Sequence, residues 1–142
     1  MSLTLTVFLS RELVPGKEEF ERAIIALGFS VQIDTSYVPF RSSGFLPCVV
    51  GGRKSGFEIS FEDSQAALEQ LKQIKDAVGA RDAAIVFRWG GDMAECASAL
   101  IVSAALASAF DAVVYSSDDD ILCSASELAE EAKSALLMLE KP

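Results

Sequence analysis

The chain has 142 residues, of which 51% are hydrophobic and 23% charged, a composition that indicates one folded domain over residues 1–142 and excludes a largely disordered chain. Its formal net charge of −9 disfavours binding to nucleic acid or to an anionic membrane surface. The absence of histidine excludes Ser-His-Asp triads, Cys-His dyads and His-ligated zinc sites within the chain.

The first third of the sequence predicts a strand, a helix and a second strand. Apolar residues alternate with threonines over residues 3–9, which is the period of a half-buried strand. Pro15 and Gly16 then open a helix that closes at Gly28. The same alternation over residues 29–33 predicts the second strand.

The middle of the sequence predicts a loop, a hairpin and a helix. Residues 35–47 contain two prolines and little periodicity, so they form the longest predicted loop. Strands over 48–50 and 57–61 flank a glycine-rich turn at 51–56. Apolar residues on one face then predict a helix over 63–78.

The last third predicts the centre of the core. Residues 83–89 are almost continuously apolar, as in a central strand that is covered on both faces. Residues 93–110 form a helix that is apolar almost all round and therefore buried on several sides. A strand over 112–116 and a helix that begins at Ser124 complete the chain.

These elements predict an α/β sandwich of the α+β type, with about six strands, about four helices and the order β-α-β-β-β-α-β-α-β-α. Residues 3–34 and 82–116 each resemble a strand-helix-strand unit, whose two strands run in the same direction. Combined with the predicted hairpin, such units predict a mixed sheet.

The negative charge is concentrated in the second half of the chain. Residues 1–81 carry 10 acidic and 9 basic side chains, a net charge of −1, whereas residues 82–142 carry 11 acidic and 3 basic, a net charge of −8. Such a surface attracts a basic protein partner, although it could equally serve only to keep the protein in solution. The candidate contact residues are Asp118, Asp119, Asp120, Glu127, Glu130 and Glu131.

Aromatic residues and arginine in the predicted loop are candidate anchors for the same partner. Tyr37, Phe40 and Arg41 belong to residue types that are enriched at the centres of protein interfaces. The alternative interpretation is that the rings fold back onto the core. The sequence leaves homo-oligomerisation open.

No cofactor, metal ion or catalytic residue is predicted. Gly90 and Gly91 lie between a strand and a helix, but Asp92 places negative charge where a phosphate would bind. The acidic run 118–120 lacks the glycine and glutamate of a calcium loop, and the cysteines form no Cys-x-x-Cys pair. The free thiols and the absence of a secretion signal predict a soluble, cytoplasmic protein without a membrane span.

A second candidate site belongs to a different class of function. Glu58, Arg88 and Cys48 could line a small-molecule pocket or supply carboxylate or thiol chemistry. A deep pocket containing all three would favour this alternative over protein binding.

The segments 56–58, 87–92, 95–97, 104–106 and 111–115 resemble small acidic bacterial proteins, some of which are similar to immunity proteins that protect a cell against a toxin. The resemblance covers roughly residues 55–116, and it implies a cytoplasmic protein binder without catalysis. Together with the acidic half, it predicts a non-enzymatic, immunity-type inhibitor of a basic toxin or enzyme.

Overall fold

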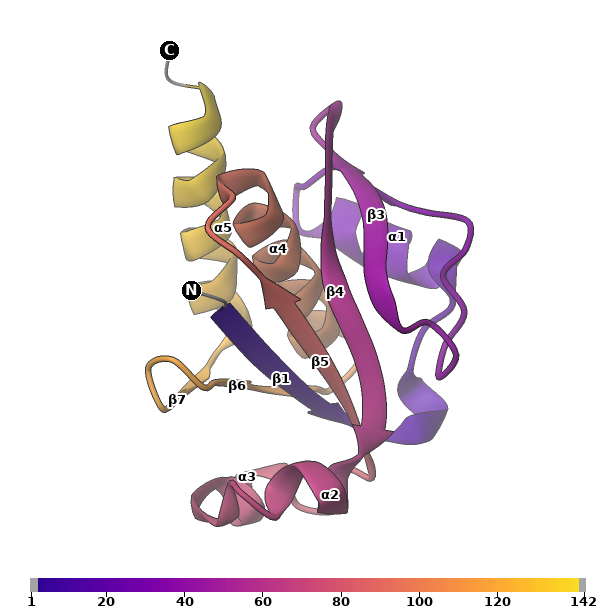
Figure 1. Cartoon of the computed structure of the whole chain (residues 1–142), viewed down its shortest axis with the longest axis vertical. Coiled ribbons are helices and arrows are strands. Elements are labelled where there is room, and N and C mark those ends of the chain that lie inside the picture. Colours follow the sequence, from indigo (N-terminus) through magenta and orange to yellow (C-terminus); the bar gives the residue numbers. More distant parts are fainter. Residues whose placement is uncertain (1–2, 141–142) are drawn as a thin grey trace.

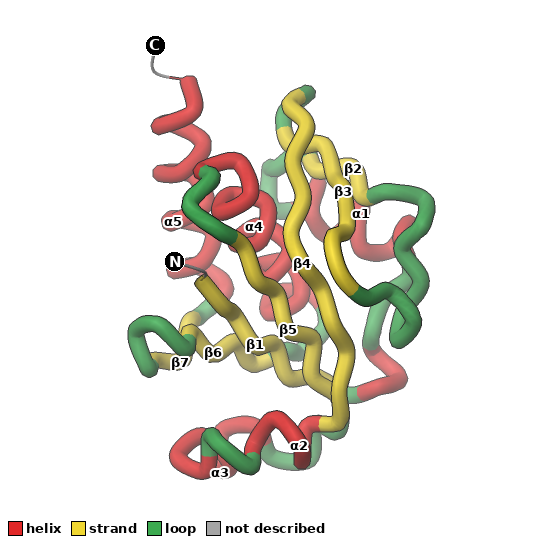
Figure 2. Tube along the Cα trace, in the orientation of Figure 1, coloured by secondary structure: helices red, strands yellow, loops and turns green. Residues whose placement is uncertain are grey.

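The computed structural model describes residues 3–140, which form one antiparallel sheet with helices on both of its faces (Figures 1 and 2). The seven strands follow the spatial order β2-β3-β4-β5-β1-β6-β7. The strands are β1 (Leu3–Leu9), β2 (Val31–Ile33), β3 (Gly44–Val50), β4 (Arg53–Asp63), β5 (Ala83–Trp89), β6 (Val113–Ser116) and β7 (Ile121–Cys123). The helices are α1 (Lys17–Ala26), α2 (Ser64–Leu68), α3 (Lys75–Val78), α4 (Met93–Ala109) and α5 (Ala125–Glu140), with 3-10 turns η1 (Arg11–Leu13) and η2 (Lys72–Ile74).

The predicted α+β sandwich is confirmed, but every strand pair is antiparallel rather than mixed. The two strand-helix-strand units explain the difference. β5 and β6 run in the same direction, as predicted for such a unit, but β1 lies between them and is antiparallel to both. β1 and β2 also run in the same direction, and β5, β4 and β3 separate them. The crossovers are therefore present without any parallel neighbours.

The hairpin of β3 and β4 is longer than the sequence predicted. Its register pairs Gly44 with Ile59 and Val50 with Arg53, so that Gly51 and Gly52 form the whole turn. Gly56 lies within β4, where the ring of Phe45 covers it. A Cβ on Gly56 would lie 2.3 Å from Cζ of Phe45, so only glycine allows this close approach.

The predicted helix over 63–78 is broken into α2, η2 and α3. Leu71, at φ −132° and ψ 46°, lies outside the helical region and interrupts the segment. The predicted apolar face nevertheless forms, because Leu68, Leu71, Ile74 and Val78 pack into one cluster with Phe8, Ala84 and Tyr115. This cluster lies on the face of the sheet opposite to α4.

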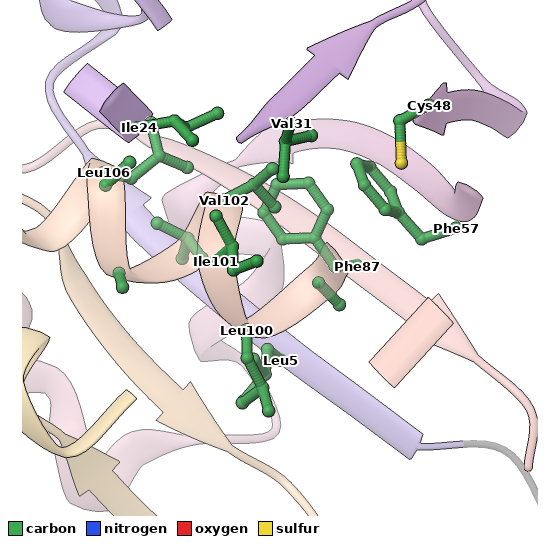
Figure 3. Packing of buried hydrophobic residues seen from close by; sticks show 14 of the residues in the cluster. Leu5, Ile24, Val31, Cys48, Phe57, Phe87, Leu100, Ile101, Val102 and Leu106 are labelled. Carbon is green, nitrogen blue, oxygen red and sulfur yellow. The ribbon is translucent and has the colours of Figure 1, made fainter. Parts of the chain in front are cut away.

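The main core lies between the sheet and a layer made of α1, α4 and α5. β5 is the fourth of seven strands, which confirms its predicted central place. Most of α4 is buried, including every residue from Ala97 to Leu106. Figure 3 shows Leu100, Ile101, Val102 and Leu106 of α4 among side chains of the sheet and of α1. Asp92 caps this helix by accepting the backbone N–H of Glu95 at 3.0 Å.

No helix among residues 3–140 is both long enough and apolar enough to cross a membrane.

Replacement of Leu100 by aspartate should lower the free energy of unfolding by at least about 3 kcal/mol, since it removes buried apolar surface and places an unpaired carboxylate in the core. The matched control is Leu137→Asp on α5, because Leu137 is 60% exposed and the same change there should alter stability by less than about 1 kcal/mol. Urea unfolding of both variants measures the difference. Equal stabilities would contradict the placement of α4.

Candidate functional site

The β6–β7 hairpin and the first turns of α5 form one strongly acidic surface. We call this the acidic surface, and it consists of Asp118, Asp119, Asp120, Glu127, Glu130 and Glu131, all of which are exposed. Burial and then the neighbouring carboxylates of Asp119 and Glu127 raise the pKa of Glu131 above its ordinary value. Asp119 of the hairpin and Glu127 and Glu131 of the helix therefore lie close enough to repel one another.

Two of these aspartates also hold the hairpin in place. A carboxylate oxygen of Asp118 accepts the backbone N–H of Thr4, at the start of β1, at 3.0 Å. Oδ1 of Asp120 accepts the hydroxyl of Tyr115 at 2.5 Å and Nε2 of Gln73 at 3.3 Å. The hydrogen bonds from Tyr115 and Gln73 lower the pKa of Asp120, so its charge is stabilised by the fold.

The glutamates of the acidic surface on α5 differ in the hydrogen bonds and ion pairs that they form within the fold. Glu127 accepts the backbone N–H of Ser124 at 2.9 Å and donates its own backbone N–H to the hydroxyl of Ser124 at 3.1 Å, which completes a capping box. Glu130 lies 3.4 Å from Lys133. Within residues 3–140, no hydrogen bond or ion pair engages the side chains of Asp119 and Glu131.

The thiol of Cys123 lies under this surface. Burial raises its pKa first, and the carboxylates of Glu131, Glu127 and Asp119 raise it further because they oppose a second negative charge. These surroundings disfavour the thiolate of Cys123, which is the nucleophilic form of cysteine.

The candidate anchors of the loop lie at the opposite edge of the sheet, beside β2 and β3 (Figure 1). Tyr37 is buried, and its hydroxyl donates to the carbonyl oxygen of Pro15 at 2.8 Å, so the alternative interpretation of a core residue holds for it. Phe40 is 37% exposed and packs on Phe61, while the guanidinium of Arg11 lies 4.5 Å from its ring centroid.

Arg41 is exposed in the same loop. Because the sheet separates this loop from the β6–β7 hairpin, neither Phe40 nor Arg41 belongs to the acidic surface.

The alternative site of Glu58, Arg88 and Cys48 does not form. Glu58 and Arg88 are register partners on the face of the sheet opposite to α4, and both are exposed there. Cys48 points to the other face, beside Phe57 in the core (Figure 3). It is 4% exposed, and burial raises the pKa of its thiol.

A pocket that the sequence did not predict lies at the β2–β3 edge. Its volume is about 690 Å³, and it has both acidic and basic walls. The lining includes Lys17, Glu21, Gln32, Phe45 and Lys54, together with Cys48 of the predicted alternative site but neither Glu58 nor Arg88. The signal for it was weak, because these residues come from four separate elements, α1, β2, β3 and β4.

The sequence analysis also missed two apolar side chains beside the acidic surface. Ile121 and Leu122 form most of β7 and are 47% and 42% exposed. They lie between the strand predicted over 112–116 and the helix predicted to begin at Ser124, where no element was predicted, although two consecutive large apolar residues after three aspartates were a signal for a short strand.

Within residues 3–140, no three Cys, Asp or Glu side chains are arranged to hold a metal ion. Comparison of the chain with protein-family models, curated protein sequences and solved structures finds no match in any of the three. The acidic surface and the residues around it are therefore the features that bear on function.

The hydrogen bond between Tyr115 and Asp120 predicts a pH effect. Because the pKa of Asp120 is lowered from 3.8, its charge stabilises the fold above the unfolded-state pKa, and this contribution is lost as the pH falls through the folded-state pKa. In Tyr115→Phe the pKa of Asp120 should rise towards 3.8, and less stability should be lost between neutral and acidic pH than in the wild type.

Carboxyl chemical shifts of Asp120 and urea unfolding at neutral and acidic pH measure these two effects. Tyr37→Phe is the control, because its hydroxyl donates to a carbonyl rather than to a carboxylate. An unchanged pKa of Asp120 in Tyr115→Phe would show that the hydrogen bond does not form in solution.

Proposed function

We propose that this chain is a non-enzymatic protein-binding module that docks a basic protein on its acidic surface, in the manner of an immunity-type inhibitor of a basic toxin or enzyme. The observation that carries the proposal is the gathering of six exposed carboxylates with two exposed apolar side chains, Ile121 and Leu122, on one hairpin and the helix that follows it.

Repulsion among the carboxylates supports a charged partner. Of the cations among the described residues, Lys133 alone forms an ion pair with a member of the acidic surface. The raised pKa of Glu131 reports, beside its burial, an unfavourable interaction with Asp119 and Glu127. A cationic partner would remove this repulsion, and long-range attraction would increase its rate of association.

Apolar contact is needed as well, because exposed ion pairs alone contribute at most about 1 kcal/mol each. Ile121 and Leu122 are available for this purpose, whereas Tyr37 is already used in the core. The resemblance to immunity proteins supports the proposed class of partner and a cytoplasmic location.

A small-molecule-binding function is the second candidate, and the pocket of about 690 Å³ at the β2–β3 edge is what favours it. Thiol chemistry at Cys48 is not part of this candidate, because a buried thiol with a raised pKa is a poor nucleophile. Saturable stabilisation by a small ligand, lost in Phe45→Ala and retained when the acidic surface is neutralised, would favour the pocket.

The test of the main proposal neutralises the carboxylates that the fold uses least. In the triple variant Asp119→Asn, Glu130→Gln and Glu131→Gln, association with a basic partner isolated by affinity capture should slow at low salt. Wild type and variant should converge as salt rises, because screening weakens long-range attraction.

The matched control removes three exposed carboxylates elsewhere, through Glu12→Gln, Glu18→Gln and Glu19→Gln. It changes the net charge equally and should keep a rate near that of the wild type. Equal slowing in both triple variants would mean that only net charge matters, and no slowing in either would mean that the acidic surface only keeps the protein in solution.

A further inference from the structure

The two edges of the sheet are protected to different degrees. At the β2 edge, the backbone N–H of Ile33 donates to a carboxylate oxygen of Glu21 on α1 at 2.7 Å, so a side chain already occupies this edge. Proteins commonly cover or block edge strands in this way, because unpaired backbone groups recruit other strands.

Among the described residues, no side chain blocks the β7 edge at Leu122 in this way. Ser117 donates its backbone N–H to the carbonyl oxygen of Thr4 at 3.4 Å, which makes these two a hydrogen-bonded pair of the antiparallel ladder. Hydrogen-bonded and non-hydrogen-bonded pairs alternate along an antiparallel ladder. Val114 and Ser116 of β6 are non-hydrogen-bonded with β1, so their backbone N–H and C=O groups point towards β7. On β7, their partners Cys123 and Ile121 face β6, and the backbone of Leu122 faces outwards.

No hydrogen bond within residues 3–140 uses the outward backbone groups of Leu122. Ser124, the next residue that turns the same way, has its N–H taken by Glu127 at 2.9 Å. The open part of the edge is therefore short, and it is centred on Leu122.

The side chains around this opening define what fits it. Ile121 and Leu122 are consecutive in a strand, so they point to opposite faces of the sheet and would contact a paired strand from both sides. Carboxylates lie at both ends of β7, from Asp118 to Asp120 before it and at Glu127 and Glu131 after it. Charge complementarity therefore favours lysine or arginine at both ends of the incoming strand.

We infer that β7 pairs with a short extended segment of the partner in which basic residues flank a centre of consecutive apolar residues. The partner residue opposite Leu122 donates to its carbonyl oxygen and accepts its N–H, which adds an eighth strand to the sheet. This inference rests on the proposed function and specifies how the same site recognises its partner.

The probe is an acetylated and amidated peptide with a centre of consecutive valines flanked on each side by lysines, and its binding is measured by fluorescence anisotropy. Leu122→Pro removes the outward N–H and should weaken binding about tenfold, as expected for one lost hydrogen bond and its unpaired acceptor. Because that N–H bonds nothing in the fold, β7 should remain paired with β6. Leu122→Ala removes side-chain contact but keeps the N–H, so it separates the two contributions.

A second peptide with the same charges, but with N-methyl groups on every amide of its apolar centre so that neither edge can pair, tests pairing without changing the protein. It should bind the wild type about as weakly as the unmodified peptide binds Leu122→Pro. Equal affinity of the two peptides for the wild type would overturn strand pairing, even if Leu122→Pro failed to fold.

The triple variant Asp119→Asn, Glu130→Gln and Glu131→Gln separates this inference from the proposed function. If it weakens binding of both peptides equally while methylation has no effect, docking on the acidic surface stands and strand pairing fails. If neither peptide binds the wild type more tightly than the triple variant, both the proposed function and the inference fail.

Discussion

Burial of α4 is the constraint on which the rest of the structure depends. The helix is apolar almost all round, so its surface must be removed from water on the side of the sheet and on both flanks. The sheet, α1 and α5 supply this cover, and Leu128 and Ala132 of α5 are fully buried as a result. Because α5 is held against α4, its first turn is fixed beside the β6–β7 hairpin, and the acidic surface follows from this placement.

The elements nearest to α4 were the most predictable from sequence. A continuous apolar run identified β5 as central, and an apolar helix identified α4 as buried, because a strand or helix that is apolar on all sides must be covered on all sides. Strand order was not predictable in the same way. Insertion of β1 between β5 and β6 depends on pairing residues more than 70 positions apart, and no local pattern reports which of several strands will be the neighbour.

The candidate site was predictable in part for the same reason. Asp118 to Asp120 are adjacent in the chain, and helical spacing places Glu127 and Glu131 on one side of α5, so their proximity was a local property. The hydrogen bonds of Asp118 to Thr4 and of Asp120 to Gln73 join distant segments and left no sequence signal. Cys48 was different. The alternation of Leu46, Cys48 and Val50 already indicated one buried face, but the strand was predicted to begin too late to show it.

The acidic surface contains carboxylates whose negative charge the fold stabilises and a carboxylate whose charge it disfavours. Asp120 is stabilised as an anion by Tyr115 and Gln73, and Glu127 by the start of α5, so both carboxylates contribute to the fold. For Glu131, burial and neighbouring charges favour the neutral form. A bound cation of the partner would relieve the repulsion at Glu131. Such a cation gains the most binding free energy at a carboxylate for which no internal hydrogen bond competes. Recognition on the acidic surface should therefore centre on Glu131 and Asp119 rather than on the aspartates that order the turn.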